Sequence, residues 1–138
     1  MDDVERIERA MVRIRRRQRR RTLARRQGMS GQAFDVLDAI EAGRAVTVSE
    51  IAQALGVDQP RASRLVAAAV ADGLVRREAD QADGRRSVLV LTEAGQEAVA
   101  QAHRTRRAAF AAAMAGWTEA ERAEFARLLT RFVDALPD

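Results

Sequence analysis

The chain has 138 residues, of which 47% are hydrophobic and 32% charged, a size and composition that favour one domain with a packed core and exclude a chain that is disordered by composition. It has no cysteine, which excludes disulfides, thiolate metal ligands and thiol-based redox sensing. All 24 basic residues are arginine, and residues 1–27 hold 11 of them at a net charge of +7, whereas the rest of the chain is net −3.

A helix is predicted over residues 4–27. An apolar residue recurs at every third or fourth position, the spacing with which one face of a helix packs on a partner. This stripe consists of Val4, Ile7, Met11 and Ile14. Gly28 is suited to end the helix. Seven arginines between residues 13 and 21 circle its remaining surface, so we expect some of them to lie near an interface rather than in solvent.

A second helix and a short strand are predicted over residues 30–47. Ser30 can cap the helix, and Gly43 ends it. The buried face would consist of Phe34, Leu37 and either Ile40 or Val36. Residues 45–47, Ala-Val-Thr, are the strand candidate.

Two short helices joined by a tight turn are predicted over residues 48–55 and 59–72. Thr47 and Glu50 have the spacing of a capping box at the start of the first helix. Asp58 can cap the second helix, and Pro60 lies in its first turn, where a missing N–H costs little. This pair is typical of a helix-turn-helix.

In a helix-turn-helix, the second helix enters the major groove of DNA and its first side chains reach the base edges. Arginine can pair with guanine, glutamine with adenine, and serine with a phosphate or a base. The candidate DNA-binding residues on this helix are Gln59, Pro60, Arg61, Ser63 and Arg64. A helical hairpin with a solvated polar face is the alternative interpretation.

A β-hairpin is predicted directly after this pair, which favours DNA binding. Its first strand covers residues 74–79, its turn contains the Asp83-Gly84 pair, and its second strand covers residues 88–91. A narrow minor groove attracts arginine. The candidate DNA-binding residues at the tip are therefore Asp83, Arg85 and Arg86, with Asp83 placed to hold the Arg85 guanidinium. A solvated loop is the alternative.

Two more helices are predicted at the end of the chain. Thr92 can cap the first, which runs to about residue 115, and Thr118 and Glu121 have the spacing of a second capping box. The last helix carries an apolar stripe made of Phe125, Leu128, Leu129, Phe132, Val133 and Leu136. The predicted fold class is mostly α with a small β-hairpin wing, an α+β winged helix.

The order and spacing of these motifs resemble the MarR family of winged helix-turn-helix transcriptional regulators. The matching segments are Ser49-Glu50-Ile51-Ala52, Leu55-Gly56-Val57, Ala62-Ser63-Arg64-Leu65-Val66, Gly73-Leu74-Val75-Arg76-Arg77, Asp83 with Arg85, and Leu91-Thr92 with Gly95. Two features depart from the family pattern. The first helix is richer in arginine, and Arg86 stands where the family often has a small residue.

The resemblance implies an obligate homodimer whose interface is formed by the first helix and the last two. It also implies a small-molecule pocket between this interface and the DNA-binding lobe. We therefore expect one MarR-like domain over 1–138, in which 4–27 and 93–138 form the helical dimerisation region and 30–92 form the winged helix-turn-helix lobe. DNA contact carries over to residues 59–64 and to Asp83 and Arg85.

The expected function is that of a sequence-specific double-stranded DNA-binding transcriptional regulator, a repressor that a small ligand releases from a pseudo-palindromic operator. Arginine is well shaped to bind carboxylates. Arg15, Arg16 and Arg17 are therefore candidate ligand-binding residues for an anionic effector, although pairing with acidic groups of the partner subunit or simple solvation explains them too. We find no pattern of catalytic residues and expect no enzymatic activity, no cofactor and no metal site.

An architectural protein that binds nucleic acid without sequence preference, through its arginine-rich first helix, is the alternative function. A steep salt dependence with little sequence preference would favour it. The longest apolar run, residues 108–117, is shorter than the ~20 residues of a membrane helix, and the acidic first residues lack the apolar core of a signal peptide. We expect a cytoplasmic protein.

Overall fold

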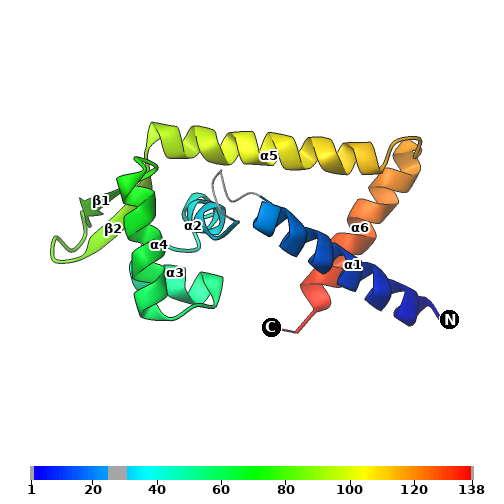
Figure 1. Ribbon diagram of the computed structural model, residues 1–138, viewed down its shortest axis with the longest axis horizontal. Helices are drawn as coiled ribbons and strands as arrows, with labels where there is room; N and C mark the ends of the chain where they lie inside the picture. The colour runs from blue at the N-terminus through cyan, green and yellow to red at the C-terminus, as the bar shows by residue number, and fades with distance from the viewer. Residues whose placement is uncertain (1, 25–30, 138) are drawn as a thin grey trace. The chain divides into compact units, whose positions relative to one another are not determined.

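The structure, a computed structural model, describes residues 2–24 and 31–137. Within these ranges it has six helices and one two-stranded hairpin (Figure 1), which confirms the predicted fold class. The elements are α1 (Asp3–Ala24), α2 (Gly31–Glu41), α3 (Val48–Leu55), α4 (Gln59–Ala71), β1 (Val75–Ala79), β2 (Ser87–Leu91), α5 (Glu93–Ala113) and α6 (Glu119–Ala135). The predicted helix end at Gly28 and the predicted cap at Ser30 lie outside the described residues.

The chain divides into two compact units, Met1–Val99 and Ala100–Asp138, and the boundary falls within α5. Each unit is described separately below, and the prediction of a single domain stays a prediction. Among the described residues, no helix is both long enough and apolar enough to cross a membrane.

The first unit has one hydrophobic core, to which α2, α3, α4 and the hairpin contribute. The predicted buried face of α2 is confirmed, and Val36 and Ile40 are both part of it. The largest fully buried side chains are Leu37, Ile51, Val36, Val66, Val75 and Val99. Among the described residues, no polar or charged residue is buried. The core therefore rests on apolar packing, in which each buried aliphatic side chain contributes about 1.5–3 kcal/mol.

The hairpin pairs β1 and β2 antiparallel, with Val75 opposite Leu91 and Ala79 opposite Ser87. Leu89 and Leu91 are buried on the core face. The prediction of a strand at residues 45–47 is wrong, because residues 46 and 47 form a bend and Ala45 belongs to no helix or strand. A backbone hydrogen bond joins it to β2: the Leu89 N–H donates to the Val46 carbonyl at 2.7 Å.

The start of α5 lies against the start of the hairpin. The Thr92 N–H donates to the Leu74 carbonyl at 3.1 Å, and the Thr92 hydroxyl donates to the Gly73 carbonyl at 2.6 Å. The Gly95 N–H donates to the Thr92 hydroxyl at 3.1 Å, which caps α5 as predicted. Gly95 is buried, and a Cβ added to it would lie 2.0 Å from the Leu74 carbonyl oxygen. Only glycine permits this approach.

The second unit contains the end of α5 and the whole of α6. Thr118 and Glu121 form the complete capping box that the sequence predicts, and these hydrogen bonds lower the pKa of Glu121. Trp117 packs edge-on against Phe125, with ring centroids 5.5 Å apart. On α6, a hydrogen bond from Arg127 lowers the pKa of Glu124. The start of α6 is therefore fixed by local contacts.

Replacement of Gly95 by alanine should destabilise the first unit. The new methyl group would overlap a backbone oxygen, so we expect the free energy of unfolding to fall by about 1–3 kcal/mol, although alanine normally stabilises a helix interior relative to glycine. Urea unfolding followed by circular dichroism measures this. Gly84→Ala is the matched control, because Gly84 has open space around its Cα and no positive φ. Equal stability of Gly95→Ala and the parent would contradict the close contact.

Candidate nucleic-acid interface

The helix-turn-helix is defined by local caps at each end of its turn. The Gly56 backbone has φ 66° and ψ 36°, a left-handed conformation that ends α3. The Val57 N–H then donates to the Ala52 carbonyl at 3.0 Å. Asp58 caps α4 by accepting the Arg61 N–H at 2.8 Å, and Pro60 lies in the first turn, both as predicted. The direction in which α4 starts is therefore set by the residues of the turn.

One face of α4 is buried in the core and the other is exposed. Ala62, Val66 and Ala69 are the buried residues. The predicted DNA-contacting residues of this helix are all exposed: Gln59, Pro60, Arg61, Ser63 and Arg64. This face therefore combines groups that can hydrogen-bond base edges and phosphates with the free N–H groups of a helix N-terminus.

The two arginines at the start of α4 differ in their surroundings. The Arg61 guanidinium donates to the side-chain carbonyl of Gln32, which belongs to α2. The Arg64 guanidinium is exposed and makes no ion pair or hydrogen bond within the described part of the chain. Gln32 is a contact that the sequence analysis missed, because no local pattern links residues 29 positions apart.

The tip of the hairpin is closed by its own backbone. The Asp80 N–H donates to the Arg86 carbonyl at 2.8 Å, and the Arg86 N–H donates to the Asp83 carbonyl at 3.0 Å. Asp83 accepts the backbone N–H of Arg85 at 3.1 Å, rather than the guanidinium predicted from the sequence. The Arg85 guanidinium is exposed and pairs with no other described residue.

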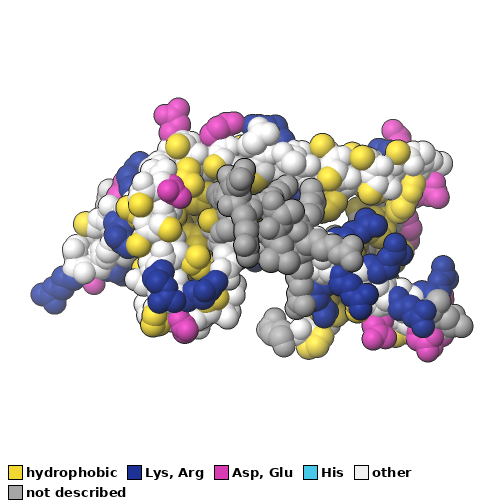
Figure 2. Space-filling model, viewed as in Figure 1, with side chains coloured by type: hydrophobic (Ala, Val, Ile, Leu, Met, Phe, Trp, Pro, Cys, Tyr) yellow, Lys and Arg dark blue, Asp and Glu magenta, His cyan; other side chains and the backbone are white. Residues whose placement is uncertain are grey.

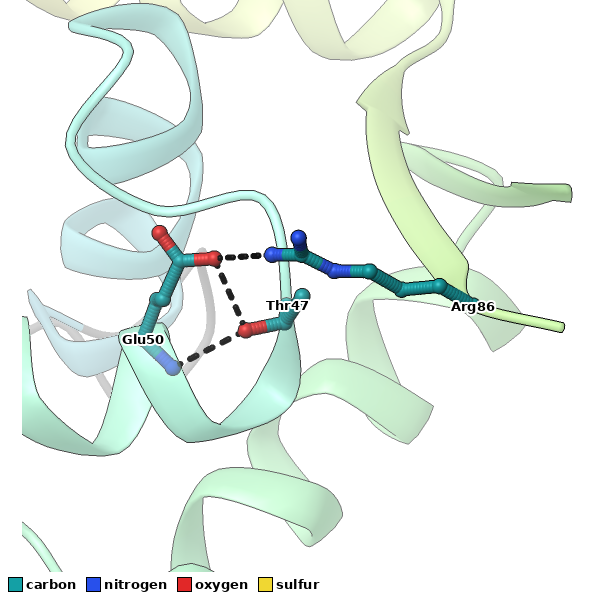
Figure 3. Close-up of polar contacts among 3 residues, drawn as sticks. All are labelled: Thr47, Glu50 and Arg86. Atoms are coloured by element: carbon teal, nitrogen blue, oxygen red, sulfur yellow. Dashed lines mark hydrogen bonds and ion pairs between the residues drawn. The ribbon is translucent and has the colours of Figure 1, made fainter. Parts of the chain in front are cut away.

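Arg86 is oriented toward α3. Its Nη2 lies 2.9 Å from the Glu50 carboxylate, which also accepts the Thr47 hydroxyl at 3.0 Å (Figure 3). The Glu50 N–H donates to the Thr47 hydroxyl at 3.2 Å, so one half of the predicted capping box forms. The other half does not, because the Glu50 carboxylate bonds Arg86 and the Thr47 hydroxyl instead of the Thr47 N–H.

Arginine side chains also cover α1. Figure 2 shows them over this helix as well as over the hairpin and the helix-turn-helix. The candidate ligand-binding residues Arg15, Arg16 and Arg17 are all exposed, as is Arg13. The expectation that some of the arginines lie near an interface with a partner subunit therefore stays a prediction. The side chains of Arg19, Arg20 and Arg21 lie outside the described part of the structure.

Residues 27–86 match the model of the MarR family, which confirms the resemblance predicted from the sequence. The fold matches that of a MarR family protein from Bacillus stearothermophilus with a TM-score of 0.83 at 19% identity, covering 97% of this chain and 96% of that chain. No curated protein matches the sequence.

Two further solved structures share this fold. FabT of Streptococcus pneumoniae, solved in complex with DNA, matches with a TM-score of 0.74 at 21% identity, covering 96% of each chain. BpsR of Bordetella bronchiseptica, whose DNA binding is regulated by 6-hydroxynicotinic acid, matches with a TM-score of 0.59 at 23% identity, covering 90% of this chain and 93% of that chain. At these identities the likeness establishes the fold.

Proposed function

We propose that this chain, whose winged-helix segment matches the MarR family, is a sequence-specific double-stranded DNA-binding regulator of transcription. The observation that carries this proposal is the exposed face of α4, which is capped at its N-terminus and followed directly by a hairpin with an arginine-bearing tip. The same fold binds DNA in FabT, which supports the proposal. Such a function places the protein in the compartment that holds the DNA, in agreement with the expected cytoplasmic location.

In the proposed complex, α4 enters the major groove. Gln59 and Arg61 would read base edges, and Ser63 and Arg64 would bind phosphate or base. The exposed Arg85 guanidinium would enter the adjacent minor groove, where the negative potential is strongest. Asp83 would shape the tip through its backbone hydrogen bond.

Alanine variants of Arg61 and Arg64 should weaken DNA binding in different ways. If Arg61 reads a base, Arg61→Ala should cost about 1–3 kcal/mol and relax the preference at one position. If Arg64 binds phosphate, Arg64→Ala should weaken binding to all sequences and reduce the salt slope by about one per site. Fluorescence anisotropy on an operator selected from random duplexes, titrated with salt, measures both effects.

Arg44→Ala is the matched control for these variants, because it removes the same charge from an exposed position outside both the proposed DNA-contacting residues and the expected dimerisation region. Unchanged binding by both α4 variants would refute the assignment of α4 as the recognition helix. A steep salt slope without any selected sequence would favour the architectural alternative instead.

We also propose that the protein is a homodimer. Large apolar side chains are exposed on α1 and in the second unit, whereas α2, α3, α4 and the hairpin bury theirs in the core. They are Val4, Ile7, Ile14, Phe110, Trp117, Phe125, Leu128, Leu129, Val133 and Leu136. Exposed apolar surface of this extent marks an interaction site. A dimer would also supply two copies of α4 for successive major grooves, about 34 Å apart.

Leu129→Glu should disrupt the dimer, because a buried, unpaired carboxylate is strongly disfavoured. We expect a dimerisation affinity at least about tenfold weaker and, with it, weaker operator binding. Light scattering after gel filtration distinguishes a 15.2 kDa monomer from a dimer of twice that mass. Ala123→Glu, on the same helix but off the apolar stripe, is the control. A wild-type monomer at micromolar concentration would contradict the proposal.

We further propose that the protein is a repressor that an anionic ligand releases from DNA, with Arg15, Arg16 and Arg17 as candidate ligand-binding residues. The exposed guanidinium groups on α1 support this, because arginine binds carboxylates through two parallel hydrogen bonds. The DNA binding of BpsR is regulated by a carboxylic acid, which supports the same class of ligand. A ligand can shift the equilibrium only through its different affinities for the free and DNA-bound states.

A thermal-shift screen tests this ligand class with 6-hydroxynicotinic acid and other aromatic carboxylates, each paired with its neutral amide. We expect the acids to raise the melting temperature and to release DNA, and the triple variant Arg15→Gln, Arg16→Gln, Arg17→Gln to lose both effects. Stabilisation by neutral or cationic aromatics only, with the triple variant behaving like the parent, would refute it.

A further inference from the structure

We propose that Glu50 is a positioning residue for the hairpin, and that Arg86 acts by holding the hairpin against α3 rather than by contacting DNA. This inference rests on the proposed DNA-binding function and revises the role expected for one of its residues. It also implies that, of the two adjacent arginines at the tip, Arg85 is the one that contacts DNA.

The Glu50 carboxylate receives two hydrogen bonds from two different elements. Arg86 Nη2 lies 2.9 Å from its Oε1, and the Thr47 hydroxyl lies 3.0 Å from the same oxygen. Thr47 in turn caps α3 by accepting the Glu50 N–H. The carboxylate is therefore fixed by the helix start on one side, and it can orient the guanidinium that reaches it from the hairpin (Figure 3).

A backbone contact joins the same two segments. The Leu89 N–H donates to the Val46 carbonyl at 2.7 Å, one residue before the cap of α3. The hairpin is thus joined to the segment of residues 46–50 at two places, once through β2 and once through the tip. A two-stranded hairpin is marginally stable in isolation. Its strands pack on α2 and α4, and the two contacts with residues 46–50 add a constraint on where its tip lies.

The backbone hydrogen bonds of Arg86 also fix the backbone position of Arg85. Because the Arg86 N–H and carbonyl both bond within the tip, an anchored Arg86 side chain fixes the turn that contains the preceding residue. The Arg85 guanidinium then extends from a defined backbone and has no described protein partner. An arginine paired with a carboxylate is already neutralised, and we expect it to release no counterion from DNA.

Alanine variants of the two partners distinguish a positioning role from a DNA contact. The distinguishing result is whether Glu50→Ala weakens operator binding or leaves it unchanged or tighter. If Arg86 is a positioning residue, Glu50→Ala and Arg86→Ala should each weaken operator binding by roughly two- to fivefold, the range expected for a partly exposed ion pair. The double variant should be no weaker than either single variant. Arg86→Ala should leave the salt slope unchanged.

A DNA-free measurement accompanies these titrations. Amide hydrogen exchange at Leu89 and Arg86 should speed up in Glu50→Ala, because the hairpin then opens more often from α3. Glu78→Ala is the matched control, since it breaks a second exposed ion pair of the hairpin, with Arg76, that does not reach α3. It should leave the exchange at both amides unchanged.

The opposite results would overturn the proposal. If Arg86 binds a phosphate, Glu50→Ala should leave binding unchanged or tighten it, because a competing carboxylate is gone, and Arg86→Ala should reduce the salt slope by about one per site. Unchanged amide exchange in Glu50→Ala would also refute it. If the wild type binds no DNA, the proposed function fails, whereas the exchange measurement still tests the contact between Glu50 and Arg86.

Discussion

The close contact between Gly95 and the Leu74 backbone is the constraint on which the first unit depends. It sets the point at which the hairpin leaves the core and the point at which α5 begins, because both elements start within a few residues of it. The Thr92 hydrogen bonds to Gly73 and Leu74 fix the same junction from the other side. The position of the proposed DNA-contacting tip is therefore coupled to the long helix that leads into the second unit.

The sequence predicted those features that are determined by neighbours three or four residues away. The caps of α3, α4, α5 and α6 follow from side chains that bond the backbone of the same turn, so they are visible as spacing. The features that it missed depend on distant partners. Arg86 and Arg61 form contacts 36 and 29 residues away, and a segment such as 45–47 becomes a strand only if enough of its backbone pairs with β2.

The winged-helix lobe of the first unit and the second unit use their apolar residues in opposite ways. In the first, aliphatic side chains from α2, α3, α4 and the hairpin fill a common core. In the second, Phe125, Leu128, Leu129 and Val133 of α6 remain exposed, and the helix is stabilised by its capping box and by the pairing of Glu124 with Arg127. Local interactions preserve the helix without burying its apolar face. The unit can then offer that face to a partner chain.

The absence of lysine has a consequence for the surface formed by Arg64 and Arg85. A guanidinium stays protonated across the pH range in which proteins are folded. It also offers no amine for acetylation, the reaction that removes positive charge from lysine-based DNA-binding surfaces. The positive charge of these two side chains is therefore constant, and neither a fall in pH nor an acyl donor removes it. Control of the proposed DNA binding therefore cannot come from acetylation of this surface.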